Sequence, residues 1–253
     1  MNRFKRYLTS RTLRRQEIPF LVWQGVIKKI PVLAPLTNKE KTRLRILTTL
    51  FLNEKIFTGV HDLEITFEMK ITIAAQACLE ILYLGLDAFD GWIEIVVYPG
   101  AFVVKREVVD ENGLVSMQEH GLSGESWGRG PVIFSWEDVA RDSYNLIPGH
   151  NVVIHEFAHK LDMLTGRTNG LPPLHPDMDI QDWAAALTEA YTRLNVLLDH
   201  NQQTYFNAYA ATNPAEFFAV ICEYFFTTPE TLKKHRPKIY QQLKAYFKQD
   251  PIT

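Results

Sequence analysis

Two hydrophobic patterns divide the first part of the chain, and the earlier one is typical of helices. From residue 36 to residue 54, apolar side chains recur at helical spacing, with Leu44, Leu47 and Phe51 on one face and a Thr or Asn as the N-cap. Residues 71–86 are almost entirely apolar. The pattern therefore predicts two helices, and the second of them is expected to be buried.

The pattern changes to one typical of strands in the middle of the chain. Residues 91–109 are rich in β-branched side chains and are interrupted at Pro99-Gly100, which predicts two strands joined by a tight turn. The next segment, residues 110–131, is polar and contains several glycines, so we expect a loop there. Residues 132–136 (VIFSW) are apolar again and predict a short strand.

Helical spacing returns in the last part of the chain. Residues 151–166 form a largely apolar stretch that carries two histidines, and a proline-rich loop follows at residues 170–177. Further helices are predicted at residues 180–198, 214–226 and 229–247. Helices first, a small sheet in the middle and helices last indicate an α+β fold.

Composition narrows the class of protein. The chain has 253 residues, of which 46% are apolar, so it can bury a substantial core. Its formal net charge of −2 does not indicate nucleic-acid binding. Cys78 and Cys222 both lie in apolar runs far apart in the sequence, which suits reduced, buried thiols in a cytoplasmic protein. No run approaches the roughly 18 apolar residues of a membrane span.

The stretch NVVIHEFAHKLD contains a spacing that suits a metal site. On a helix, residues four apart share a face, so His155 and His159 can both present an imidazole to one ion. Glu156 lies beside them, where a carboxylate can take a proton from a water on the metal. The alternative is a core helix on which this short motif occurs by chance.

A catalytic metal site also needs a third protein ligand. The extended scheme with a glycine and a third histidine on the same helix is excluded, because this chain has Asp162 and Thr165 at those positions. The other scheme takes a glutamate from a later helix. Glu216 and Glu223 are available there, two turns apart on one predicted helix. Glu223 and His175 are the weaker candidates, and each is expected instead to be a surface residue or a buried pair partner.

Glu216 has a competing structural role. Asn213 can act as an N-cap with Pro214 at the first helical position, which makes Glu216 the third-residue glutamate of a capping box. A helix that begins in this way needs no metal. The residues alone leave the cap and the ligand interpretation equally open.

Longer stretches of the chain resemble the Mlc titration factor A family of bacterial zinc peptidases. The resemblance runs from about Ile18 to Pro251 and is densest in DGWIEIVVYPGAFVV, SGESWGRGPVIFSW, NLIPGHNVVIHEFAHKLD and NAYAATNPAEFFAV. The family is similar in its catalytic region to anthrax lethal factor, a zincin. The resemblance therefore implies a zincin-like fold with a small mixed sheet, an active-site HExxH helix and C-terminal helices.

The resemblance also implies roles for individual residues. One zinc ion (Zn²⁺) per chain would have the ligands His155, His159 and Glu216, with Glu156 as the general base. A tyrosine seven residues before the ligand glutamate is a feature of that catalytic region, and Tyr209 reproduces the spacing as a donor to the oxyanion. The implied activity is gluzincin-like hydrolysis of peptide bonds, and endopeptidase and aminopeptidase specificity both stay open.

The chain is expected to consist of a basic arm followed by one domain. Residues 1–17 carry six basic side chains and are expected to form a flexible arm, with contact to anionic lipid or a partner as the alternative. Residues 18–253 would form a single peptidase domain, helical to about residue 90 and catalytic from about residue 91 onward. Besides a peptide or protein substrate, a transcriptional repressor of the Mlc type is an implied partner. The alternative function is a non-catalytic protein that sequesters such a repressor and carries a structural zinc.

Three positions near the candidate site leave alternatives open. The family's best-known members have a loop histidine, implied as an additional zinc ligand, where this chain has Ser116, and His120 can replace it or be an exposed loop residue. Asp162 can orient a ligand histidine or be a helix-end surface charge. The strand at 132–136 can bind substrate by strand addition, with residues 123–130 as a mobile rim, or be an ordinary core strand.

Overall fold

The structure is a computed structural model that describes most of the chain. It covers residues 17–100, 102–109, 115–122, 124–126 and 130–252, and between residues 102 and 126 it describes the backbone of the strands but not their side chains. Residues 1–16 of the predicted basic arm (1–17) lie outside the described residues, as do parts of the predicted rim at 123 and 127–129.

The first part of the chain is helical, as the hydrophobic pattern predicts. Its elements are α2 (Phe20–Ile27), η1 (Pro31–Leu33), α3 (Asn38–Glu54), α4 (Phe67–Glu80) and η2 (Leu86–Phe89). Thr37 caps α3 in a capping box with Glu40, which confirms the predicted start of that helix. The buried helix predicted at 71–86 begins earlier, after the Thr66 cap, and ends at Glu80.

A four-stranded sheet lies beside these helices. Its strands are β1 (Ile56–Gly59), β2 (Glu94–Tyr98), β6 (Val132–Ser135) and β5 (Gly124–Ser126), in the order β1-β2-β6-β5. The first three are parallel and β5 is antiparallel to β6. Because β2 and β5 occupy the two edges of β6, strand addition of a substrate directly to β6 is not available in this arrangement. Sequence patterns missed the short strand β1.

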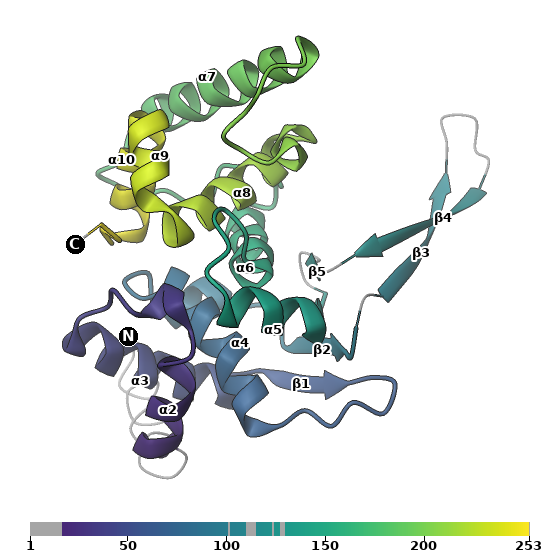
Figure 1. Ribbon diagram of the computed structural model, residues 1–253, viewed down its shortest axis with the longest axis vertical. Helices are drawn as coiled ribbons and strands as arrows, with labels where there is room; N and C mark the ends of the chain where they lie inside the picture. Colours follow the sequence, from purple (N-terminus) through teal and green to yellow (C-terminus); the bar gives the residue numbers. More distant parts are fainter. Residues whose placement is uncertain (1–16, 101, 110–114, 123, 127–129, 253) are drawn as a thin grey trace.

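The two strands predicted within residues 91–109 are present, but they enter different sheets. β2 joins the parallel sheet, whereas β3 (Phe102–Val109) pairs with β4 (Val115–Leu122) in a separate antiparallel pair. Figure 1 shows this pair extending away from the other elements. The loop predicted across 110–131 is therefore wrong where β4 and β5 form. The Asn112-Gly113 pair between β3 and β4 is a hairpin signal that indicated this outcome.

Helices make up most of the remaining chain. They are α5 (Trp136–Tyr144), α6 (Val152–Asp162), η3 (Met163–Thr165), α7 (Ile180–Asp199), η4 (Ala208–Ala211), α8 (Pro214–Thr227), α9 (Pro229–His235) and α10 (Pro237–Phe247). The single helix predicted at 229–247 is wrong, because the chain breaks at Arg236 and Pro237 begins a new helix. Proline lacks the N–H that a continuous helix requires at that point.

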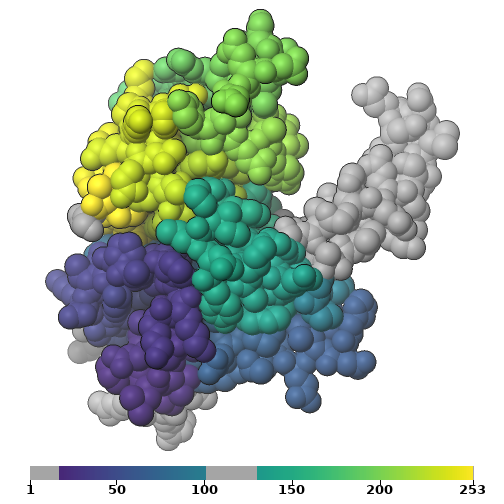
Figure 2. Space-filling view, viewed as in Figure 1, coloured from purple at the N-terminus to yellow at the C-terminus, as the bar shows by residue number. Residues whose placement is uncertain are grey.

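The helix α6 lies in the middle of the molecule, between the N-terminal helices and the group α7–α10 (Figures 1 and 2). The Phe157 ring on α6 lies 5.0 Å from the Phe89 ring and 5.8 Å from the rings of Phe51 and Trp92. Burying one such aromatic side chain stabilises a fold by about 1.5–3 kcal/mol. The aromatic cluster therefore fixes the buried side of α6. Among the described residues, every helix is too short or too polar to span a lipid bilayer.

Candidate metal centre

The helix that carries the two histidines is fixed at its start. The Asn151 side chain caps α6 by accepting a hydrogen bond from the Ile154 N–H at 3.1 Å. Its amide nitrogen donates to Gln76 of α4 at 2.8 Å, and both side chains are buried. The N-cap is thus attached to a neighbouring helix, which holds the first turn of α6 and the imidazole of His155 in place.

Three of the candidate ligands converge on one point. The His155 and His159 Nε2 atoms lie 3.2 Å apart on one face of α6. The Glu216 Oε2 atom of α8 lies 3.0 Å from the first nitrogen and 3.3 Å from the second. Among the residues that the structure describes, these three form the one group of histidine, cysteine and carboxylate side chains arranged to hold an ion.

The spacing of these atoms fits a tetrahedral ion. Donor atoms about 2.1 Å from one zinc ion at tetrahedral angles lie roughly 3.4 Å from each other. The three observed distances, 3.0, 3.2 and 3.3 Å, are close to that value. Two imidazole nitrogens and one carboxylate oxygen are also the donor types that zinc prefers. The three side chains therefore fit a divalent metal without rearrangement of α6 or α8.

The charges around the cluster favour a cation. Burial lowers the pKa of His155, but hydrogen bonds to the carboxylates of Glu216 and Glu223 raise it well above its ordinary value. Burial raises the pKa of Glu216, and the two histidines more than reverse that effect, so the pKa of this carboxyl is lowered. Without a metal, positive charge on imidazole balances the carboxylates. A bound cation would provide that charge in its place.

Glu156 lies beside the cluster with one oxygen unengaged. Its side chain is buried, and Oε2 has no hydrogen-bond partner among the described residues. Burial raises the pKa of Glu156, although electrostatic interaction with the two histidines acts in the opposite direction. A buried carboxyl with a raised pKa and a free oxygen has the properties of a general base.

Tyr209 lies close to His155. It belongs to η4, whose start is capped by the Asn207 side chain, and its ring centre is 6.0 Å from that of His155. Partial burial raises the pKa of Tyr209, and the negative charges of Glu216 and Glu156 raise it further. The hydroxyl therefore keeps its proton and can act as a hydrogen-bond donor at the edge of the site.

The two interpretations of Glu216 apply to different atoms of the same residue. Its backbone N–H takes part in the helix cap, because the Asn213 side chain accepts hydrogen bonds from Ala215 and Glu216, both at 2.9 Å. The carboxylate of Glu216 does not complete a capping box and faces the two histidines. The cap explains where α8 begins, and the side chain stays available to an ion.

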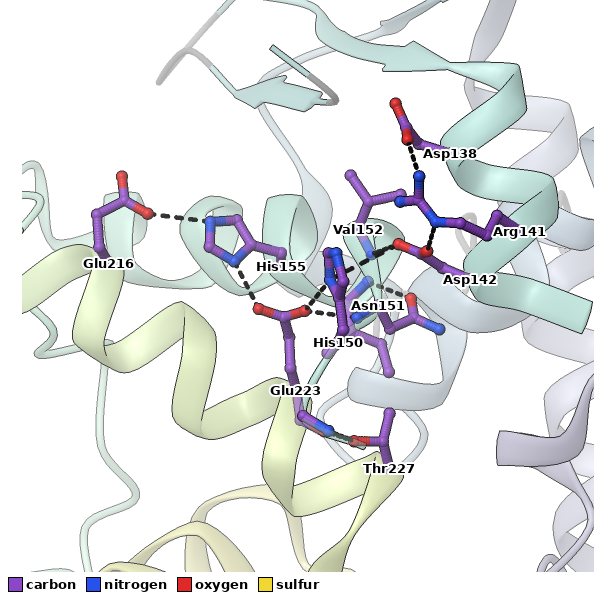
Figure 3. Close-up of polar contacts among 12 residues, drawn as sticks. Asp138, Arg141, Asp142, His150, Asn151, Val152, His155, Glu216, Glu223 and Thr227 are labelled. Carbon is purple, nitrogen blue, oxygen red and sulfur yellow. Dashed lines mark hydrogen bonds and ion pairs between the residues drawn. The ribbon is translucent and has the colours of Figure 1, made fainter. Parts of the chain in front are cut away.

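Glu223 is not one of the three converging groups, but it contacts one of them, His155. Figure 3 shows its carboxylate between α8 and the start of α6, with His155 on one side and His150 on the other. Glu223 Oε1 lies 2.8 Å from His155 Nδ1, whereas Oε2 accepts from the Asn151 N–H at 2.5 Å and lies 3.3 Å from His150 Nδ1. Glu223 is therefore a buried pair partner, which is one of the two roles expected for it besides that of a weaker ligand candidate, and it lies seven residues from Glu216 along α8.

The other candidate residues do not join the cluster. His175 bonds to the Tyr246 carbonyl oxygen at 2.8 Å and lies outside the group that could hold an ion. Asp162 accepts from the Gly170 N–H at 2.8 Å with one oxygen, while its other oxygen and His159 Nδ1 both lack partners among the described residues. The expected contact between Asp162 and a histidine is therefore absent there. Ser116 and His120 lie in β4, and their side chains are outside the described residues.

Comparisons with known proteins agree with a metal-dependent peptidase. The sequence profile of the family described as "Glucose-regulated metallo-peptidase M90" matches residues 4–248. The Mlc titration factor A of Serratia proteamaculans (strain 568) is 41% identical over 234 residues, which cover 91% of this chain and 88% of that protein. The protein of the same name from Pectobacterium atrosepticum is 40% identical and covers 91% and 87%. The one from Yersinia pestis (strain Pestoides F) is 38% identical and covers 88% and 83%.

Proposed function

The chain belongs to the glucose-regulated metallo-peptidase M90 family, and from this we propose that it is a zinc-dependent peptidase of the zincin, gluzincin-like type. The observation that carries the proposal is the convergence of His155, His159 and Glu216, with donor atoms 3.0–3.3 Å apart. We propose these three as the ligands of one zinc ion per chain. When bound, zinc supplies Lewis acidity that brings the pKa of a water toward about 7 and polarises a peptide carbonyl.

The chain's own residues would move the protons and bind the developing charge. Glu156 would accept a proton from the attacking water at its unengaged Oε2 and deliver it to the nitrogen of the departing amine. Tyr209 would donate a hydrogen bond to the carbonyl oxygen as negative charge develops there. The buried wall of α6 would keep bulk water from the base.

Metal analysis together with a peptidase assay tests this function. The purified chain should contain one equivalent of zinc and hydrolyse peptides, and a chelator should remove both zinc and activity. Glu156→Gln should keep zinc and its fold while turnover falls, because the variant loses the base and keeps the three ligands. Near-normal turnover of Glu156→Gln would contradict the role of Glu156. A chain without zinc at this site would contradict the proposal as a whole.

A second function is supported by the names of the relatives. Proteins that share 38–41% identity with most of this chain are called Mlc titration factor A. We therefore propose that a transcriptional repressor of the Mlc type is a partner of this chain. The non-catalytic alternative predicts repressor binding without peptidase activity. A pull-down with Glu156→Gln beside the wild-type chain separates the two functions, because binding should survive the loss of turnover.

Two broader expectations belong to the same proposal. We propose that residues 18–253 form one peptidase domain, which the continuous hydrophobic core from Ile18 to Phe247 supports. We also propose a cytoplasmic location, because Cys78 and Cys222 are free, buried thiols and a transcriptional repressor acts in that compartment.

A further inference from the structure

We infer that Glu223 is the positioning residue of the metal centre, holding the His155 ring so that Nε2 faces the ion. The inference rests on the proposed function, because it concerns how one ligand is presented to the metal. Glu223 contacts neither the ion site nor the reacting atoms. It acts through His155, whose Nδ1 lies 2.8 Å from Glu223 Oε1.

The geometry restrains the imidazole at both nitrogens. Nδ1 of His155 faces Glu223 and Nε2 faces Glu216 at 3.0 Å, so the ring lies between two carboxylates of α8 (Figure 3). A proton held on Nδ1 by Glu223 leaves the lone pair of Nε2 available to a metal. A carboxylate behind a ligand histidine fixes the ring orientation and raises the basicity of the ligand.

Glu223 is itself held firmly. Its side chain is only 4% exposed, and three donors surround it: His155 Nδ1, the Asn151 N–H at 2.5 Å and His150 Nδ1 at 3.3 Å. The next turn of α8 is also attached, because Thr227 Oγ1 accepts from the Gly149 N–H at 2.9 Å.

The second histidine lacks an equivalent partner. His159 Nδ1 is buried and has no hydrogen-bond partner in the part of the chain that the structure describes. Of the two histidines, His155 is therefore the one whose Nδ1 is held by a side chain in the described part of the chain. Because Glu216 and Glu223 are seven residues apart on α8, one rigid helix supplies both the third ligand and the group that orients the first.

An amide cannot reproduce what Glu223 does. In Glu223→Gln, an NH₂ group placed toward His155 would force the proton from Nδ1 to Nε2, which then cannot bind a metal. An NH₂ group placed the other way would face the Asn151 N–H, another donor. The first orientation removes His155 as a ligand, and the second sets two donors against each other and leaves a neutral amide oxygen as a weaker acceptor for His155 Nδ1, so zinc affinity should fall about 10–100-fold, as is typical for loss of such a partner.

Glu80 offers a matched control. It is a second fully buried glutamate, on α4, close enough to His155 to interact with it electrostatically. Neither of its oxygens has a hydrogen-bond partner among the described residues. Glu80→Gln therefore makes the same chemical change near the same histidine without removing a hydrogen bond to it. It should retain wild-type zinc affinity.

The experiment measures zinc dissociation constants by competition with a chromophoric chelator for the wild type, Glu223→Gln and Glu80→Gln. Circular dichroism of each metal-free protein shows whether it is folded. Weaker zinc binding in folded Glu223→Gln alone is the expected result. Wild-type affinity in Glu223→Gln, or equal weakening in both variants, would overturn the inference. A wild-type chain that binds no zinc would overturn the proposed function as well, so the two failures are distinguishable.

A measurement on the unmutated protein covers the case in which Glu223→Gln does not fold. Nitrogen-15 NMR of the zinc-loaded wild type distinguishes the two ring nitrogens of His155. We expect a proton on Nδ1 and zinc on Nε2. A His155 that binds zinc through Nδ1, or that carries no proton on Nδ1, would overturn the role of Glu223.

Discussion

At the scale of single residues, Glu216 has a structural role through its backbone and a proposed chemical role through its side chain. Its backbone serves the cap of α8 and its carboxylate faces two histidines, so a change of the side chain tests only the second role. Glu216→Gln should fold normally, because glutamine keeps the backbone contact and also suits a capping position. Zinc affinity should fall sharply, since a neutral amide replaces a charged oxygen donor. Zinc stoichiometry and a thermal unfolding curve check both statements; full zinc content would contradict the ligand role.

Tyr209 makes a different single-residue prediction. Tyr209→Phe removes one hydroxyl and no ligand, so zinc should stay bound. Turnover should fall by about 10²-fold or more, the effect of losing one oxyanion donor. The loss should fall on kcat rather than KM, because the hydrogen bond forms in the transition state. Steady-state kinetics check this, and an effect confined to KM would indicate that Tyr209 only binds substrate.

The sequence indicated which side chains converge more readily than it indicated what surrounds them. The four-residue spacing of His155 and His159 depends only on helix geometry, so the order of residues along the chain is enough to indicate it. Glu223 and His155 are 68 residues apart in the chain, so their contact depends on how α8 packs against α6. Local patterns contain no information about that approach. Spacing along α8 restricted the choice to two glutamates but could not assign their roles.

At the scale of elements, predictions held where a local signal was strong. The capping box at Thr37 and the proline at the start of α8 each place a helix boundary that the structure keeps. Pro237 is also a signal for a helix start, but the apolar pattern continues on both sides of it, so one helix was predicted where the structure has two. Strand β1 is short, and its identity comes from pairing with β2 rather than from its own residues. Pairing between distant segments is the information that a local pattern lacks.

The turn before α6 makes a prediction at this scale. Gly149 has φ of +66°, and an added Cβ would lie 2.2 Å from atoms of the Tyr224 ring. That ring is held by a hydrogen bond from the Tyr224 hydroxyl to the Tyr205 carbonyl oxygen at 2.6 Å. Gly149→Ala should therefore destabilise the fold by more than the roughly 1–2 kcal/mol that a left-handed alanine alone costs. It should also weaken zinc binding, because His150 and Asn151 contact Glu223.

Gly166 provides the control for this prediction. Its φ is +77°, but an added Cβ would meet no atom within 4 Å. Gly166→Ala thus carries the backbone strain without the clash. Denaturant unfolding of both metal-free variants gives the difference in free energy of unfolding. Equal destabilisation would show that the Tyr224 contact contributes nothing.

At the scale of the whole molecule, the candidate site joins parts that are distant in sequence. The three proposed ligands come from α6 and α8, and both helices belong to the same hydrophobic core. The parallel sheet and the N-terminal helices contribute no ligand, but the aromatic cluster around Phe157 attaches α6 to them. An ion that bridges α6 and α8 therefore binds the folded chain and not the unfolded one.

Metal removal should consequently lower the stability of the entire fold. Zinc at 100 times its dissociation constant should stabilise the native state by about 2.7 kcal/mol. For a chain of this size, that free energy corresponds to a rise in Tm of roughly 5–10 °C. Thermal unfolding with added zinc, and again after a chelator, measures the shift. His155→Ala serves as the control and should show no zinc-dependent shift, because it has lost a ligand. An equal shift in His155→Ala would show that the stabilising zinc binds elsewhere on the chain.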